Sequence, residues 1–578
     1  MKKILNLSFI IIFICSSPLL ASNYYWVGGT GAWSDYAAHW ATASGGTVFH
    51  VTIPSPTDDV YFDTNSFPAS GDTVYLDSTI TNCKTMDWSG AANAPVLYST
   101  SNIRLNLYGS LILNNSLIWA VLGDIYLLSS TAGNIINTYG VVLQGQGSGT
   151  DLRFSGSGSW SLQDGISLGI SGTIQFNSGT FLSNGFPISC GSFYINASAS
   201  TSIMLDTSTI VCGSSWNVSN TSLLTLDADS TFITSNSFSG GVGRIYRDVV
   251  CGSIDDLYND GCTFRDVQCS WIAATSSFFR NVTMSTATDF ISGTGNTFNK
   301  VIMPGTSCSI GGDGNTFDTL ICNNPGQAIS IYNNVNVTVN SLFQADGNCN
   351  GLTSITSGGN ATISKPTGTV TLNYVLLQGI TGAGGATFIA NNSVNGGNVT
   401  GITINAPAPQ NLFWVGGTGN WNDLNHWSTI SGGAGGSCVP SQVYNSVVDA
   451  NSFPTAGDSV KINVPTIYCN TMDWSAAIAP VLYSTSNIRL NLYGSLILNN
   501  SLIWAVLGDI YLLSSTAGNI INTYGVVLQG QGSGTDLRFS GSGSWSLQSG
   551  ISLGNSGSMR FDSGTFLSNG LPVICNDF

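Results

Sequence analysis

The sequence predicts an all-β protein: a right-handed parallel β-helix, or β-solenoid, with a tryptophan- and glycine-rich N-terminal cap, built as a duplicated unit. Three observations support this fold class. Only 8% of the 578 residues are charged and none is Glu, so the charged helix formers are nearly missing. Glycine is abundant, at 69 residues. Short apolar strands recur at irregular intervals of about 15 to 20 residues, separated by Gly, Asn, Ser and Thr.

The N-terminus has the pattern of an export signal. Lys2 and Lys3 precede an apolar run over residues 4–14 that is too short to span a bilayer, and Ala21 offers a small residue for cleavage. We therefore expect a secreted protein, extracellular or on the outer-membrane surface. We expect no transmembrane segment after cleavage, because Gly, Asn and Asp interrupt the later apolar stretch 107–128.

The charge balance excludes one class of partner. The formal net charge is −15 and the sequence pI is about 4.2. Nucleic acid binding needs clustered Lys and Arg, so we expect no nucleic acid partner. The hydrophobic fraction of 42% also argues against a disordered chain.

The chain contains two copies of one sequence. The segment Trp26-Val-Gly-Gly-Thr-Gly-Ala-Trp33 returns as Trp414-Val-Gly-Gly-Thr-Gly-Asn-Trp421, and residues 94–163 are identical to residues 479–548. Phe578 aligns with a position midway through the first copy, so we expect the chain to be a fragment of a longer array. The predicted domains are a signal peptide (1–21), a Trp-rich cap region (22–100), a β-solenoid (101–405), a linker (406–411), a second cap region (412–485) and a truncated second solenoid (486–578).

Within the first copy a shorter pattern recurs. Each unit has an aromatic residue, an aliphatic residue three positions later, and Cys or Met two positions beyond it. Units this short cannot bury a core alone, so we expect them to stack as coils of a parallel solenoid with like residues above one another. Antiparallel sandwiches are the alternative, but they would not repeat the same buried residue types at this interval. The aromatic positions are Tyr246, Phe264, Phe279, Phe298 and Phe317.

Tryptophans are the strongest candidate for a ligand site, since they occur at matched positions of the two copies. One interpretation is a platform for stacking sugar rings. The other is a buried cap that seals the end of the solenoid, and it is favoured because aromatic side chains bury the most area per residue. The candidate ligand-binding residues are Trp26, Trp33, Trp40, Trp414, Trp421 and Trp427.

The remaining chemistry-bearing residues give weaker signals. Two Asp clusters, 58–63 and 255–260, could supply a pair of catalytic carboxylates, but Asp favours turns and we expect no catalytic site. No metal motif is complete and we expect no cofactor, although a structural calcium ion stays an alternative. Cys438 and Cys469 could form a disulfide in the second copy. Cys251 and Cys269 are expected to be buried free thiols.

The Trp-Val-Gly-Gly-Thr-Gly-x-Trp opening, Asp63-Thr-Asn-Ser-Phe-Pro68 and Cys83-Lys-Thr-Met-Asp-Trp88 resemble a repeat of large secreted surface proteins of the phylum Bacteroidota. The opening is also similar to that of autotransporter-type β-solenoid adhesins. The resemblance implies an extracellular, multi-unit protein with an adhesive or structural role, and it supplies no catalytic residues.

The sequence therefore predicts a secreted or cell-surface β-solenoid that is structural or adhesive and not an enzyme. Glycans, extracellular matrix or a cell surface are the expected partners. The first alternative is a carbohydrate-binding module of a larger polysaccharide-active protein. The second is a β-helix glycosidase or lyase, which the scarcity of His and Lys disfavours.

Overall fold

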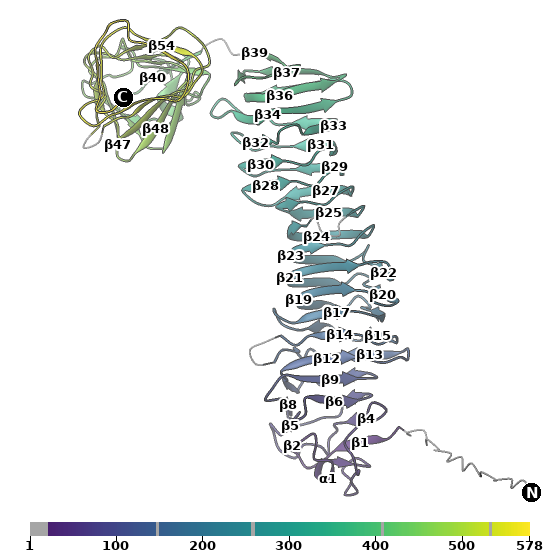
Figure 1. Ribbon diagram of the computed structural model, residues 1–578. Coiled ribbons are helices and arrows are strands. Elements are labelled where there is room, and N and C mark those ends of the chain that lie inside the picture. Colours follow the sequence, from purple (N-terminus) through teal and green to yellow (C-terminus); the bar gives the residue numbers. More distant parts are fainter. Residues whose placement is uncertain (1–20, 146–148, 256–259, 406–409, 531–533) are drawn as a thin grey trace, which may run out of the picture. The chain divides into compact units, whose positions relative to one another are not determined.

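The computed structural model describes residues 21–145, 149–255, 260–405, 410–530 and 534–578. All but the last residue of the predicted signal peptide and most of the predicted linker lie outside these ranges. The described part is all-β, with 49% strand and 1% helix, and its parallel strands stack into a β-solenoid of about 23 turns (Figure 1). The predicted fold class is confirmed. The two helical turns are α1 (Tyr36–His39) and the 3-10 turn η1 (Leu424–His426).

The chain divides into two compact units, residues 1–266 and 267–578. In the N-terminal unit each of the first coils contributes strands to three sheets, and equivalent strands of successive coils pair in parallel and in register. The first sheet contains β3 (Trp40–Ala41), β1 (Asn23–Trp26), β4 (Asp59–Tyr61), β7 (Met86–Asp87), β10 (Leu111–Ile112), β13 (Asn134–Asn137), β15 (Ser159–Leu162), β18 (Gly179–Leu182), β20 (Thr201–Met204) and β22 (Leu224–Asp227). The second contains β6 (Ile80–Cys83), β9 (Ile103–Leu107), β12 (Gly123–Leu127), β14 (Leu152–Phe154), β16 (Ile166–Ser167), β17 (Thr173–Phe176), β19 (Ile188–Asn196), β21 (Thr209–Asn220), β23 (Phe232–Ser239) and β24 (Ile245–Ile254). The third contains β2 (Gly31–Ala32), β5 (Thr73–Tyr75), β8 (Val96–Tyr98) and β11 (Ile118–Ala120).

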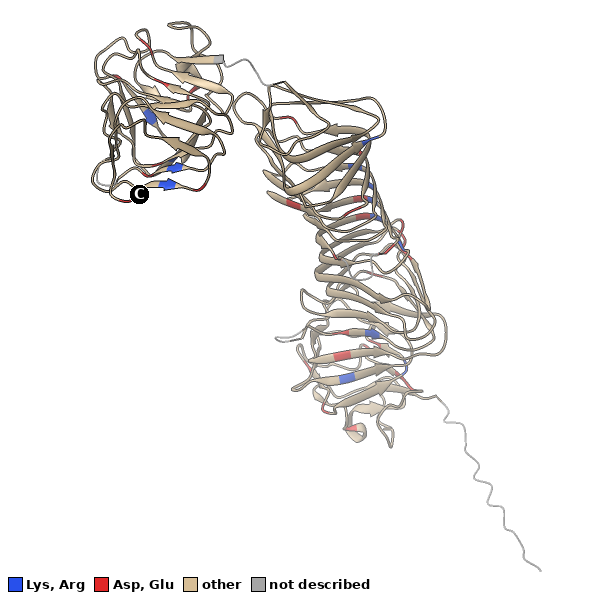
Figure 2. Cartoon of the chain, turned by 45° about the horizontal axis from the view of Figure 1, so that its top comes forward, with Lys and Arg blue, Asp and Glu red and all other residues tan. Residues whose placement is uncertain are grey.

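Alternation of side chains along each strand builds the core. In β15, for example, Trp160 and Leu162 are buried while the intervening serines are half-buried. Trp160 lies in register with Phe181 of the next coil, so apolar residues stack along the interior. Long charged side chains have little room in such a stack, and this explains the low charge content of the sequence. Figure 2 shows how few strands of each unit carry Lys, Arg or Asp.

The C-terminal unit continues the same construction. Phe279, Phe298 and Phe317 form a column of stacked rings with centroids 4.9 Å apart at each step, and Val282 is in register with Val301. The predicted stacking of like residues is confirmed for these coils. One set of strands here is β26 (Trp271–Ile272), β28 (Thr288–Ile291), β30 (Ser307–Ile310), β32 (Ala328–Ile331), β34 (Thr353–Lys365), β36 (Val375–Gly384) and β38 (Val394–Asn395). Others are β27 (Phe278–Met284), β29 (Thr297–Ile302), β31 (Thr316–Ile321), β33 (Asn336–Gln344), β35 (Thr369–Asn373), β37 (Thr387–Asn391) and β39 (Thr403–Asn405), and β25 (Thr263–Cys269) includes the boundary between the units.

The second copy repeats the strand order of the first. Its opening strand β40 pairs antiparallel with β42 and parallel with β43, as β1 pairs with β3 and β4. Its first sheet contains β42 (Trp427–Ser428), β40 (Gln410–Trp414), β43 (Tyr444–Val447), β46 (Met472–Asp473), β49 (Leu496–Ile497), β52 (Asn519–Asn522), β54 (Ser544–Leu547) and β57 (Thr565–Leu567). The others contain β41 (Gly419–Asn420), β44 (Ser459–Ile462), β47 (Val481–Ser484) and β50 (Ile503–Ala505); β45 (Thr466–Cys469), β48 (Ile488–Leu492), β51 (Gly508–Leu512), β53 (Leu537–Phe539) and β56 (Met559–Phe561); and β55 (Ile551–Ser552) with β58 (Val573–Ile574).

The disulfide expected between Cys438 and Cys469 is wrong. Cys438 bonds instead to Cys349, which lies between β33 and β34, with the two Cα atoms 5.9 Å apart. Cys469 is a buried free thiol whose pKa is raised by burial. It points into the solenoid core, whereas the loop after β42 that carries Cys438 packs its Val439 amide against the Asn350 side chain. Cys251 and Cys269 are buried and do not form disulfides, in agreement with the prediction.

In the described residues no helix is long and apolar enough to cross a membrane.

Candidate functional site

The tryptophans proposed as a sugar platform are buried. In the first copy Trp40 packs edge to face against Trp26 and Trp33, with ring centroids 5.0 and 4.8 Å apart. The Trp40 indole Nε1 donates to the Trp33 carbonyl at 2.9 Å. A stacking platform needs an exposed ring face, and these rings have none, so the arrangement matches a cap and not the platform. None of the six exposes more than 1% of its surface: Trp26, Trp33, Trp40, Trp414, Trp421 and Trp427.

The glycines between the tryptophans make this packing possible. The His39 ring stacks on Trp26 with centroids 4.6 Å apart, and it occupies the space where a side chain at position 31 would lie. A Cβ added to Gly31 would stand 1.9 Å from His39 Nε2. Gly419 and His426 have the same relation in the second copy, at 2.1 Å. The Gly-rich opening is therefore required by the cap.

In the first acidic cluster the carboxylates bind backbone amides and neighbouring side chains. Both Asp58 carboxylate oxygens accept hydrogen bonds, one from the Ser22 amide and the other from the amide and hydroxyl of Ser55. Asp59 pairs with Lys84 at 3.1 Å. These contacts are typical of turns and not of a poised acid pair. In the second cluster Asp256 lies outside the described residues.

A different group of residues forms the candidate site. On the outward face of β9, β12 and β14, the Tyr126 ring lies between two arginines. The Arg104 guanidinium carbon is 3.8 Å from the ring centroid and that of Arg153 is 5.7 Å from it. Register explains the arrangement, because Tyr126 stands directly beside Arg153 on the next coil. Both contacts have the geometry of cation–π interactions.

The two arginines have different surroundings. The Arg153 guanidinium is occupied, since Nε lies 3.1 Å from Asp124, Nη2 lies 2.7 Å from Asp151, and Nη1 donates to Gln175. Arg104 is exposed, and its Nε donates to Asn106 Oδ1 at 2.7 Å. Within the described ranges Arg104 forms no ion pair. The contacts of Arg153 therefore hold it in place beside Tyr126, while Arg104 keeps guanidinium donors for an outside acceptor.

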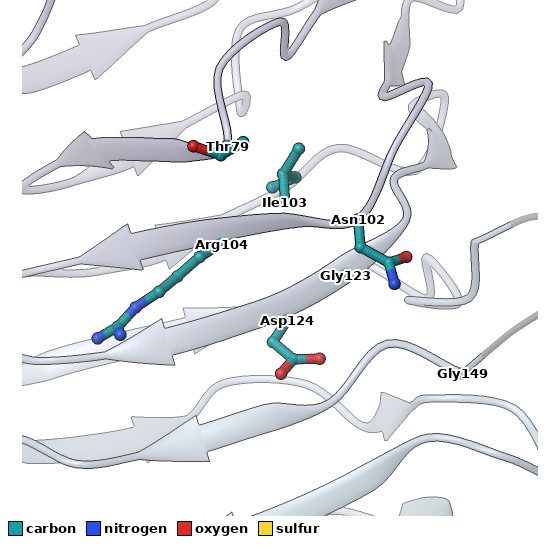
Figure 3. A pocket seen from close by; sticks show the side chains of 7 residues that line it. All are labelled: Thr79, Asn102, Ile103, Arg104, Gly123, Asp124 and Gly149. Atoms are coloured by element: carbon teal, nitrogen blue, oxygen red, sulfur yellow. The ribbon is translucent and has the colours of Figure 1, made fainter.

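A cavity of about 280 Å³ adjoins Arg104 (Figure 3). Asp124 is the register partner of Arg104, so both side chains leave the same face of neighbouring strands. The Asn102 amide and the Asp124 carboxylate lie beside this hollow and offer donors and acceptors to a polar ligand, while the Arg104 guanidinium extends away from them. The lining residues are Thr79, Asn102, Ile103, Arg104, Gly123, Asp124 and Gly149.

The second copy repeats this surface. Arg489 and Arg538 lie 3.6 and 5.2 Å from the centroid of the Tyr511 ring. Arg538 again contacts two carboxylates, those of Asp509 at 3.4 Å and Asp536 at 3.5 Å. The copies differ at several positions beside this surface, and two of the differences bear on its charge and its cavity.

One difference adds a charge: Arg560 stands where the first copy has Gln175, and it lies 3.3 Å from Asp536. The other changes a residue that lines the cavity, since Pro465 replaces Thr79. The arginine–tyrosine arrangement itself is retained.

Sequence reasoning missed this site. The available signal was the position of scarce charges: Arg104, Asp124, Asp151 and Arg153 all fall in the block that is identical in the two copies. Among the described residues, no group of three or more His, Cys, Asp or Glu side chains could hold a metal ion.

Comparison with protein-family models, curated proteins and solved structures finds no match to the chain.

Proposed function

We propose that the chain is an exported, cell-surface β-solenoid with a structural and adhesive, non-catalytic role. One observation carries the proposal: the same outward surface of arginine, tyrosine and a polar cavity occurs in both copies. Two copies of one surface in one chain suit multivalent attachment, where a second contact strengthens binding without any new chemistry. The resemblance to secreted surface repeats supports the extracellular location.

The solenoid supplies the structural half of this role. Backbone hydrogen bonds and stacked apolar columns join each coil to the next, so each coil supports its neighbours and the array can be extended by adding coils. Buried tryptophan caps begin both copies. Such a scaffold holds its outward side chains in fixed positions, which is what a repeated binding surface needs.

The test uses arginine variants of the full chain on a dense surface. Extracellular-matrix proteins freed of their glycans are immobilised, and binding is measured by surface plasmon resonance. Arg104→Ala and Arg489→Ala should each weaken the apparent affinity by about 100-fold, because each leaves one of two contacts. The double variant should lose binding. Arg280→Ala removes another exposed charge, which the second copy does not repeat, and this variant should bind like the wild type.

Two results would contradict the proposal. Binding that is the same in the double variant and the wild type would show that the repeated surface is not adhesive. Cleavage of a polysaccharide by the purified chain would contradict the non-catalytic role.

A further inference from the structure

A second surface, independent of the repeated arginines and of the proposed function, carries exposed aromatic rings. Trp271 in β26 exposes 47% of its surface and Tyr332, directly after β32, exposes 50%. Phe290 in β28 stands between them and is half-buried. Elsewhere in these strands the outward positions are mostly Ser and Thr, so three large rings close together are a departure from the local pattern.

The rings form one continuous row. The centroids of Trp271 and Phe290 are 5.9 Å apart, and those of Phe290 and Tyr332 are 5.6 Å apart. Backbone register sets the first step, since Trp271 is the direct partner of Phe290 on the next coil. The row therefore runs along the stacking direction of β26, β28, β30 and β32, and Figure 1 shows the last three of these strands stacked.

Gly311 on the intervening coil leaves room for Phe290 and Tyr332 to approach each other. A Cβ at this position would lie 3.0 Å from Tyr332 Cδ2 and 3.3 Å from Phe290 Cε2, so both rings lean over the bare backbone. The Trp271 indole Nε1 donates to Ser292 Oγ at 2.8 Å, which fixes the orientation of the ring. The rings are thus preorganised, and binding costs little side-chain entropy.

Polar groups beside the row carry no charge. Ser309 and Ser330 follow Phe290 in register on the next two coils. Within the described part of the chain neither hydroxyl has a hydrogen-bond partner, so both are available to a ligand. An uncharged row of rings with hydroxyls at its side complements a polymer that has apolar faces and hydroxyl edges.

We propose that Trp271, Phe290 and Tyr332 bind a neutral polysaccharide chain that runs along the coils, with sugar rings stacked on the aromatic faces. The net charge of −15 disfavours acidic polymers. Successive ring planes differ by 41° and 39°, so the row suits a single chain whose sugars turn relative to one another, and not a flat crystalline surface.

The experiment measures binding of hexasaccharides to the full chain by isothermal titration calorimetry. The neutral probes are cellohexaose, xylohexaose and mannohexaose, and hexagalacturonate is the acidic comparison. At least one neutral probe should bind. Trp271→Ala and Tyr332→Ala should each weaken that binding about tenfold or more, the size expected for an aromatic hot spot, while Trp271→Phe should retain most of it.

Phe278→Ala is the matched control, because Phe278 exposes 42% of its surface on the neighbouring strand β27 and lies outside the row. Its affinity and the melting temperatures of all variants should equal those of the wild type. The proposal is overturned if no neutral probe binds, if the acidic probe alone binds, or if Trp271→Ala binds normally. It is also overturned if sedimentation shows self-association that these variants abolish, since the row would then contact a second copy.

Discussion

Replacing Trp40 with alanine tests the cap directly. The side chain is fully buried against Trp26, Trp33 and Phe62. Burial of about 200 Å² of indole at ~25 cal/mol per Å² corresponds to ~5 kcal/mol, an upper value because the unfolded chain also buries part of this surface. Core Trp→Ala changes usually cost about 3–5 kcal/mol. We therefore expect a loss of about 4 kcal/mol in local stability.

Hydrogen exchange followed by mass spectrometry is the suitable assay, because a solenoid opens locally and has no single free energy of unfolding. The Val27 amide donates to the His39 carbonyl, and the His50 amide donates to Trp40. Peptides containing these amides should exchange about 10³-fold faster than in the wild type, since each ~1.4 kcal/mol of lost stability corresponds to a factor of ten.

The second copy is the internal control. Its cap peptides differ in sequence from those of the first copy, so exchange in each can be followed separately. Trp40→Ala should leave the second cap unchanged, and Trp427→Ala should affect only the second cap. Cap protection within about threefold of the wild type in Trp40→Ala would refute the reasoning, because a free energy loss of this size cannot leave exchange unchanged.

Three further predictions follow from single contacts. A non-reducing digest should yield a peptide pair linking Cys349 to Cys438 and none containing oxidised Cys469; a Cys438–Cys469 pair would contradict the structure. Burial raises the pKa of Asp289, so the folded state favours the protonated carboxyl and loses stability as the pH rises. Asp289→Asn should therefore raise the melting temperature at pH 7, and the gain should vanish below about pH 4, whereas a pH-independent gain would exclude titration. Gly123 has φ +116°, and a Cβ there would lie 2.0 Å from a carbonyl oxygen of the preceding coil. Gly123→Ala should therefore increase proteolysis near β12. Resistance to proteolysis equal to that of the wild type would show that the coil can shift to admit the side chain.

The fold could be predicted from the sequence because a solenoid repeats the same core residues in successive coils. The even spacing of Phe279, Phe298 and Phe317 in the sequence predicts that their rings stack. The pairing register of the neighbouring strands follows from the same spacing. The interpretation of the tryptophans as a buried cap agrees with their burial in the structure. Large aromatic side chains close to Gly-rich turns pack readily on each other. These inferences depend on composition and on patterns within short stretches of the sequence.

Outward side chains were harder to predict. Tyr126 and Arg153 are far apart in sequence, and they meet only because β12 and β14 pair in a particular register. Trp271 and Tyr332 form one row only because the intervening coil carries Gly311. Cys349 was missed as the partner of Cys438 because short-range spacing cannot show which loops a longer stretch of chain brings together.

The Cys349–Cys438 bond has a mechanical consequence. It closes a segment with a sequence separation of 89 residues, which includes the end of the first copy and the start of the second. If the chain is pulled at its ends, tension passes from Cys349 to Cys438 through the sulfur atoms and bypasses the backbone between them. About 300 Å of contour length is withheld from extension in this way. With the bond intact a pulled chain would thus be a shorter and stiffer tether, and reduction would add this length to it.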